Sequence, residues 1–396
     1  MAITRDEEGL LYVVSRGSET PAFFPCKRVT VLTPDEELVR EFGTKVPPEE
    51  ADSSAPDGTF MWPTSIALDK NGIAYVADEW LNRISVFDKN GECISKWGTL
   101  GDGEGEINHP SGLAFDAEDR LYLVDSANHR VQIFTKEGKF ISTWGVHGTG
   151  DGELNHPWGI EIDHIGDVYV ADWRNDRIQK FDRDGQFLMK FGSSGQGDGE
   201  FNRPSGIAVD KEGIIYVTDF KNDRLQVFHA DGSFITELTG DATLSKWGRE
   251  RLELDPGMMR GRDRAQGLQE REKMFNGPIA VEVDDEGLVF VVETARQRLQ
   301  VYRKQVASFH GGPLQNTGDT TLKRKEPRPS AEGRGSLIWS SNEGHFPGSV
   351  VGVFSAATAG ITITRIIRFS ALVLVFVTKL AQSFVSVVSG VGYIRN

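Results

Sequence analysis

Two histidines occupy positions at which imidazole chemistry is plausible. His109 and His156 are 47 residues apart, and each stands directly before a proline. Imidazole is a frequent ligand of zinc and a frequent acid–base group near neutral pH. This spacing allows a site built on two imidazoles, with or without a metal ion.

A second set of candidate residues follows acidic residues that recur along the chain. Glu79-Trp80 comes after Asp78, Trp173-Arg174 after Asp172, and Phe220-Lys221 after Asp219. Aromatic residues and Arg are enriched in protein interfaces. These residues predict a binding surface, although packing against a neighbouring element explains each aromatic residue equally well when it is taken alone.

Both sets belong to an internal repeat. Prolines recur at Pro63, Pro110, Pro157 and Pro204, and acids at Asp78, Asp125, Asp172 and Asp219, with a step of 47 residues in each series. One copy reads as four short strands, over 112–116, 121–125, 130–134 and 140–145. A fixed period of about 40 to 50 residues with four strands per unit is typical of propeller blades.

Two further copies bring the number of blades to six. One ends at Gly43, and the other covers 279–309 with a short final strand at 306–309. The predicted fold class is therefore all-β, a six-bladed β-propeller of four-stranded blades. Its innermost strands surround a central channel, and the loops after the repeated acids lie at one end of that channel with the residues before the repeated prolines.

The repeat resembles the NHL repeat. The resemblance rests on GEINHPSGL (105–113), LYLVD (121–125) and NHRVQIF (128–134), with NDRIQKF (175–181) and NDRLQVF (222–228) as close variants. It covers nearly all of residues 1–309. It implies a propeller but selects no activity, because similar propellers bind proteins, bind RNA or act as enzymes.

The variable positions of the repeat define the predicted ligand-binding and partner-binding face. The position before the proline is occupied in turn by Trp62, His109, His156, Arg203 and Gly277. The complete predicted face consists of Trp62, Glu79, Trp80, His109, His156, Trp158, Trp173, Arg174, Arg203, Phe220 and Lys221. In contrast, five acid–Arg pairs recur in the blades, from Asp78/Arg83 to Glu293/Arg298, and we interpret them as bidentate structural pairs that hold the loop between the second and third strands.

Two functions of different class remain open. The first, which we prefer, is a binding scaffold without chemistry of its own, for a protein, peptide or small ligand. The second is a metal-dependent lyase or hydrolase in the channel, similar to the propeller lyases that amidate peptides. That resemblance implies zinc held by several histidines, but two of the equivalent positions here, Arg203 and Gly277, are not histidine. Calcium at the GDGE linkers is the other metal considered, and solvated turns are preferred there.

The chain divides into three predicted regions. Residues 1–310 form the propeller, with a helical insertion at about 241–275 that breaks at Asp255-Pro256-Gly257 and covers one side of the channel with Trp247, Met258 and Met259. Residues 311–345 form a basic flexible linker. Residues 346–396 form an apolar tail in which Arg365, Arg368 and Lys379 interrupt any span of 20 residues. The tail is compatible with membrane association and equally with a change of reading frame.

Charge and cysteine content narrow the class of partner. The net charge is −14, and the excess of acids lies in residues 1–310. A nucleic acid partner is therefore not expected unless one face holds a local basic patch. The two cysteines, Cys26 and Cys93, exclude a disulfide framework and a RING-type zinc module. The N-terminal residues contain no secretory signal, so we expect a cytoplasmic monomer.

Overall fold

The computed structural model describes the propeller and parts of the segments that flank it. The described residues are 1–17, 27–47, 54–242, 268–309, 349–358 and 361–372, with isolated positions at 50, 52, 253, 254, 257, 260, 261 and 264. The predictions for Trp247, Met258 and Met259, and for the linker at 311–345, concern residues outside these ranges.

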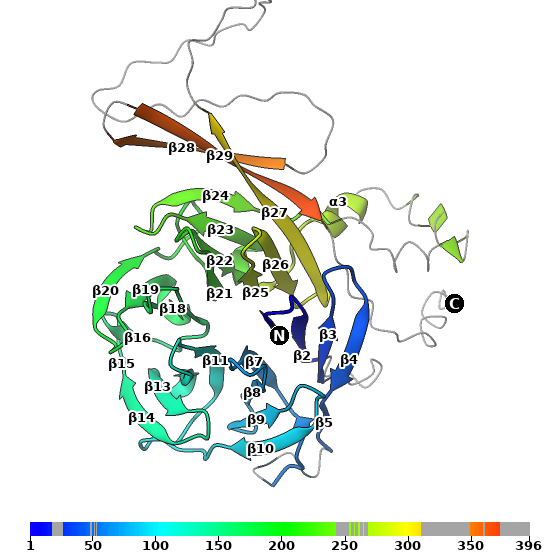
Figure 1. Cartoon of the computed structure of the whole chain (residues 1–396), viewed down its shortest axis with the longest axis vertical. Helices are drawn as coiled ribbons and strands as arrows, with labels where there is room; N and C mark the ends of the chain where they lie inside the picture. The colour runs from blue at the N-terminus through cyan, green and yellow to red at the C-terminus, as the bar shows by residue number, and fades with distance from the viewer. Residues whose placement is uncertain are drawn as a thin grey trace, which may run out of the picture.

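Six antiparallel sheets form a closed ring around a central channel (Figure 1). Blade 1 contains β1 (Ala2–Arg5), β2 (Leu11–Ser15), β3 (Arg28–Leu32) and β4 (Leu38–Phe42). Blade 2 contains β7 (Pro63–Leu68), β8 (Ala74–Asp78), β9 (Arg83–Phe87) and β10 (Cys93–Trp97). Blade 3 contains β11 (Pro110–Phe115), β12 (Arg120–Asp125), β13 (Arg130–Thr135) and β14 (Phe140–Trp144).

The other half of the ring repeats this order. Blade 4 contains β17 (Ile160–Ile162), β18 (Val168–Asp172), β19 (Arg177–Phe181) and β20 (Phe187–Phe191). Blade 5 contains β21 (Pro204–Val209), β22 (Ile215–Asp219), β23 (Arg224–Phe228) and β24 (Phe234–Leu238). Blade 6 begins with β25 (Pro278–Val283), β26 (Leu288–Glu293) and β27 (Arg298–Phe309). Strand β1 contacts both β7 and β25, which closes the ring. The predicted six-bladed all-β propeller is confirmed.

Blade 6 differs from the prediction at its outer edge. Residues 306–309 continue β27 and do not form a separate fourth strand. The position next to β27 is occupied by β29 (Ile361–Leu372), which pairs in turn with β28 (Ser349–Thr358). Both strands fall within the segment that the sequence analysis assigned to the apolar tail, and the repeat pattern contains no signal for their pairing.

The insertion before blade 6 is described only in part. It contains the helix α3 (Leu268–Lys273), which lies within the predicted helical range 241–275. Across the described ranges of the chain, no helix is both long and apolar enough to cross a membrane.

The apolar cores lie between neighbouring blades. Ile84 and Val86 of blade 2, for example, share one buried cluster with Leu121 and Leu123 of blade 3. Strands alternate their side chains between two faces, so each blade contributes to the cluster on either side. Blades 1 and 6 share a buried cluster in the same way, with Leu11 of blade 1 against Phe290 of blade 6, so every blade of the ring has a neighbour on both sides.

Glycines close the outer hairpins, as the repeat predicts. Gly91, Gly138, Gly185 and Gly232 all have φ between 79° and 89°, a range that favours glycine. At Gly185 a Cβ atom would also lie 2.3 Å from the ring of Trp144 in the preceding blade. This glycine therefore allows the turn and the close approach of two blades.

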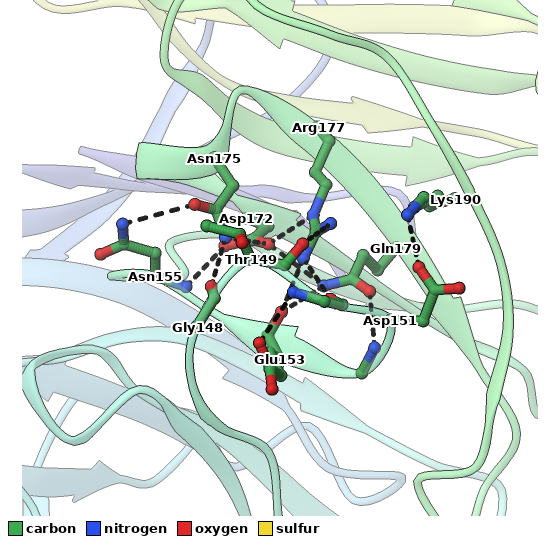
Figure 2. A network of polar contacts seen from close by, with 12 residues as sticks. Gly148, Thr149, Asp151, Glu153, Asn155, Asp172, Asn175, Arg177, Gln179 and Lys190 are labelled. Atoms are coloured by element: carbon green, nitrogen blue, oxygen red, sulfur yellow. Dashed lines mark hydrogen bonds and ion pairs between the residues drawn. The ribbon is translucent and has the colours of Figure 1, made fainter.

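The repeated acid and Arg anchor the linker that enters each blade (Figure 2). In blade 4, Asp172 accepts hydrogen bonds from Arg177 Nε at 2.8 Å, Gln179 Nε2 at 3.1 Å and the backbone amide of Asn155 at 2.7 Å. The guanidinium Nη atoms of Arg177 donate to the carbonyls of Thr149, Gly150 and Glu153. Blades 3 and 5 repeat this network around Asp125 and Asp219.

This geometry corrects the predicted bidentate pairing in blades 2 to 5, whereas in blade 6 Arg298 donates Nε and one Nη to the two carboxylate oxygens of Glu293, as predicted. In blades 3, 4 and 5 each Arg gives only Nε to the acid. In blades 3 and 4 both Nη atoms donate to carbonyls of the linker between blades, whereas in blade 5 one Nη of Arg224 donates to linker carbonyls and the other to Glu237 Oε2. In blade 2, Arg83 reaches the carbonyls of Ala55, Pro56 and Thr59, while Asp78 binds backbone amides. The pairs are structural, and they fix the linker that enters the blade as well as the loop between the second and third strands.

Replacing Asp172 with Asn should destabilise the protein strongly. Asp172 is fully buried, and the substitution leaves the buried Arg177 without its charge partner, which costs about 3–5 kcal/mol. Asp151→Asn is the matched control, because Asp151 is exposed in its ion pair with Lys190 and should contribute less than about 1 kcal/mol. Urea unfolding measures both variants. Equal, small losses of stability would contradict the anchoring role of Asp172.

Candidate functional site

The loops that contain the predicted binding residues meet at one end of the channel. Backbone hydrogen bonds join the loop after each acid to the residues before the proline, as between Glu79 N and Trp62 O at 2.9 Å and between Arg174 N and Asn155 O at 3.0 Å. We call the following residues the mouth ring: Trp62, Glu79, Trp80, His109, Ser126, Ala127, His156, Trp173, Arg174, Arg203, Phe220, Lys221, Gly277, Thr294 and Ala295.

In blades 3, 4 and 5 a side chain of the preceding blade fixes the residue that stands before the proline. His109, His156 and Arg203 have φ of 55°, 47° and 61°, a range that is uncommon for residues other than glycine. Their amides donate to Asn82 Oδ1, His129 Nδ1 and Asp176 Oδ1 at 2.8, 3.0 and 2.8 Å. The sequence analysis missed these three acceptors. They recur with the same step of 47 residues, so the repeat contained the signal.

In blade 2 the mouth ring contains an aromatic pair beside a cation. The rings of Trp62 and Trp80 lie 4.8 Å apart at 66°, and the guanidinium of Arg16 lies 4.6 Å from the centre of the Trp62 ring. Arg16 also pairs with Glu79 at 3.3 Å. Trp80 remains 46% exposed. This sector therefore offers an apolar surface whose local charge is largely balanced.

Blades 4 and 5 form a second aromatic sector. Arg203 lies 5.0 Å from the centre of the Trp173 ring, and Lys221 lies 5.0 Å from the centre of the Phe220 ring. Trp158 packs 6.1 Å from Trp173 and lines the channel below the mouth ring. The structure thus brings together the predicted residues of these two blades.

His156 belongs to a cluster of three imidazoles that the repeat pattern did not predict. The ring of His156 lies 4.5 Å from that of His129, which lies 4.3 Å from that of His147. His109 instead contacts Asn108 Oδ1 through Nδ1 at 2.6 Å. Partial burial and the neighbouring charges of His156, His147 and Arg174 lower the pKa of His129 to about 4, so its imidazole is neutral at physiological pH.

The donor sets do not fit a metal ion. His129 Nδ1 already accepts the amide of His156, and in the described part of the chain no three His, Cys, Asp or Glu side chains are arranged to hold a metal. In the GDGE linkers, Glu153 Oε2 accepts the amide of Gly150 at 2.8 Å and Glu200 Oε2 that of Gly197 at 2.8 Å. These carboxylates cap their own turns, which supports the interpretation of the linkers as turns.

The channel contains two carboxyl groups that the sequence analysis also missed. Glu161 of β17 and Glu282 of β25 line a cavity of about 240 Å³ between the innermost strands. Desolvation raises the pKa of both groups, and the repulsion from Glu282 adds to the shift at Glu161. Ala67, Ala114 and Ala208 occupy the equivalent position in blades 2, 3 and 5, so an alignment of the repeats reveals the two acids.

Glu161→Gln should stabilise the protein at alkaline pH. The raised pKa means that the folded state binds a proton more tightly than the unfolded chain, whose Glu titrates near 4.3. The ionised group therefore destabilises the fold at pH 8, and this penalty disappears as the pH falls toward about 4. We expect a gain of about 1 kcal/mol or more at pH 8 in urea unfolding, and little gain at pH 4. The exposed Glu286→Gln is the control, and equal effects of both variants would refute the assignment.

Comparisons with known proteins agree with this architecture. A family model described as an NHL repeat matches residues 108–134, and one described as a 6-bladed beta-propeller matches residues 163–251. No protein with a curated description matches the chain in sequence.

Several solved structures have a similar fold at low identity. A protein of unknown function from Bacteroides thetaiotaomicron VPI-5482 is 19% identical with a TM-score of 0.50, over 76% of this chain and 68% of that one. Virginiamycin B lyase from Staphylococcus aureus is 13% identical with a TM-score of 0.47, over 76% and 79% of the two chains. A chain of a nidogen/laminin complex is 14% identical with a TM-score of 0.46, over 74% and 88%. The structure with a TM-score of 0.50 is evidence for the fold alone. From its repeats, its closed ring of blades and the two family models, the chain is a six-bladed β-propeller in which residues 108–134 match an NHL repeat.

Proposed function

We propose that the protein is a binding scaffold that holds a protein, peptide or small ligand on its mouth ring. The observation that supports this proposal most directly is the pairing of half-buried aromatic rings with cations, Trp62 with Arg16 and Trp173 with Arg203. Aromatic and Arg side chains dominate the binding energy of many interfaces. A rigid ring of blades presents these side chains with little loss of entropy on binding.

The repeats themselves separate binding residues from structural ones. The anchoring acid and Arg recur in blades 2 to 6, where they fix the linkers. The two positions after the acid change from blade to blade, from Glu79-Trp80 to Ser126-Ala127 and Trp173-Arg174. A position that changes between equivalent blades is not needed to build a blade, so its side chain is available for recognition.

A second candidate function is catalysis in the channel. Carboxyl groups with raised pKa values are common at catalytic sites, and Glu161 and Glu282 are such groups. The metal-dependent lyase or hydrolase that relies on His109 and His156 has less support, because these histidines belong to no three-ligand set among the residues that the structure describes. We therefore rank the binding scaffold first.

Replacing Trp80 with Ala should weaken the binding of peptides selected on the parent protein by at least about tenfold, as expected for a central aromatic contact. Random peptides displayed on phage are selected on the parent protein, and the affinities of the selected peptides are measured by interferometry. Ile94→Ala is the control, because Ile94 is 56% exposed on β10, the outermost strand of blade 2. The proposal fails if the selected peptides bind both variants as tightly as the parent.

Metal analysis separates the two candidate functions. We expect the purified full-length protein to contain no stoichiometric zinc or calcium, because His129 Nδ1 is occupied and the linker carboxylates cap their turns. Elemental analysis is made on the parent and on the His109→Ala, His156→Ala double variant. A stoichiometric metal that is lost in the double variant would favour the lyase or hydrolase.

A further inference from the structure

We infer that the mouth ring recognises an acidic peptide with apolar side chains, whose carboxylates are received by Arg174, Arg203 and Lys221. This inference rests on the proposed function and specifies the chemistry of its ligand. Four steps support it: the local charge, the orientation of the cations, the spacing of the aromatic residues and the acidic border of the face.

The mouth-ring positions of blades 4 and 5 have a charge opposite to that of the whole chain. Arg174 and Lys221 are exposed, and neither forms an ion pair within the described residues. The side chain of Arg203 is 33% exposed and keeps one longer contact of 3.5 Å with Asp176. The equivalent mouth-ring positions of these two blades contain no acid. Three cations therefore stand together on a protein with a net charge of −14.

The orientation of the cations suits carboxylates. The guanidinium of Arg203 lies over the Trp173 ring, and one Nη atom donates to the Trp173 carbonyl at 3.4 Å. A guanidinium that is already stacked loses less freedom when it forms two parallel hydrogen bonds with a carboxylate. Lys221, held near the Phe220 ring, adds a point charge beside it.

The aromatic residues require a ligand with more than one apolar group. Trp62 and Trp80 belong to blade 2, whereas Trp173 and Phe220 belong to blades 4 and 5. Blade 3, between these sectors, presents small residues at the positions after its acid, Ser126 and Ala127. An inorganic anion would use only the cations. A peptide can place acidic groups on blades 4 and 5 and apolar groups on both aromatic sectors.

An acidic border argues against a nucleic acid. The tips of the linkers around blades 3 to 5 expose Asp102, Glu104, Asp151 and Asp198. Asp151 pairs with Lys190 (Figure 2), which lies on β20, the outermost strand of blade 4. This border therefore lies farther from the channel than the mouth ring. A nucleic acid that extended from the mouth ring over these blades would place its phosphates beside these carboxylates, which would repel them. A short peptide can bind within the mouth ring without reaching this border.

Fluorescence polarisation on the full-length protein tests the inference with three labelled probes. The first is a peptide of repeated Glu-Glu-Trp-Gly units, the second replaces each Glu with Gln, and the third is a single-stranded oligothymidylate. We expect the Glu peptide to bind at least about tenfold more tightly than the Gln peptide, with an affinity that falls as salt is added. Arg174→Ala should weaken the binding of the Glu peptide by about threefold to tenfold and leave the binding of the Gln peptide unchanged. Arg183→Ala is the control, because Arg183 is exposed in blade 4 on the loop between β19 and β20, at the opposite end.

Each other result has a defined meaning. Equal binding of the two peptides would overturn the acidic ligand and leave the aromatic binding surface in place. Tighter binding of the oligothymidylate, weakened by Arg174→Ala, would overturn the inference in favour of a nucleic acid. If neither peptide binds but the phage-selected peptides depend on Trp80, the inference fails and the proposed function stands. If the selected peptides do not depend on Trp80 either, both fail.

Discussion

The structure depends on one buried carboxylate in each of blades 2 to 6. Asp172 and its equivalents end the second strand of a blade and receive an amide of the incoming linker, as Asn155 N shows at 2.7 Å. A buried carboxylate without partners would be too costly to retain, so its hydrogen bonds must all form when the blade folds. The same contacts fix where one blade ends and the next begins. The ring geometry follows from this repeated constraint.

These anchors also fix the backbone that positions the side chains of the mouth ring. The loops after the acids are short, and in blades 3 to 6 the residue before the proline is held by a side chain of the preceding blade, as His156 is by His129. Side chains that vary, such as Trp173 and Arg203, therefore project from a backbone that hardly varies. A surface of this kind can change its ligand by substitution without a change of fold, which is why similar propellers serve many functions.

The net negative charge of the chain gave no indication that cations gather on this face. Counted over the whole sequence, acids exceed bases by 14, and that excess argues against anionic partners. The described structure separates the charges, because acids gather in linker tips such as Asp151 while Arg174, Arg203 and Lys221 gather at the mouth. Recognition depends on the local distribution of charge, so the net charge is a poor guide to the ligand here.

The sequence by itself determined the fold and most members of the mouth ring. The step of 47 residues from Pro110 to Pro157 places every strand of the regular blades, because identical units can bury their apolar faces only against one another. It also places Trp80, Trp173 and Phe220 at one end of the channel. Only the tertiary structure decided which side chains meet: His129 joins His156 through a contact between blades, and Glu161 approaches Glu282 across two blades. The addition of β29 to blade 6 likewise pairs segments without a shared pattern. A periodic sequence specifies contacts within and between equivalent units, whereas contacts between unlike residues depend on the closure of the ring.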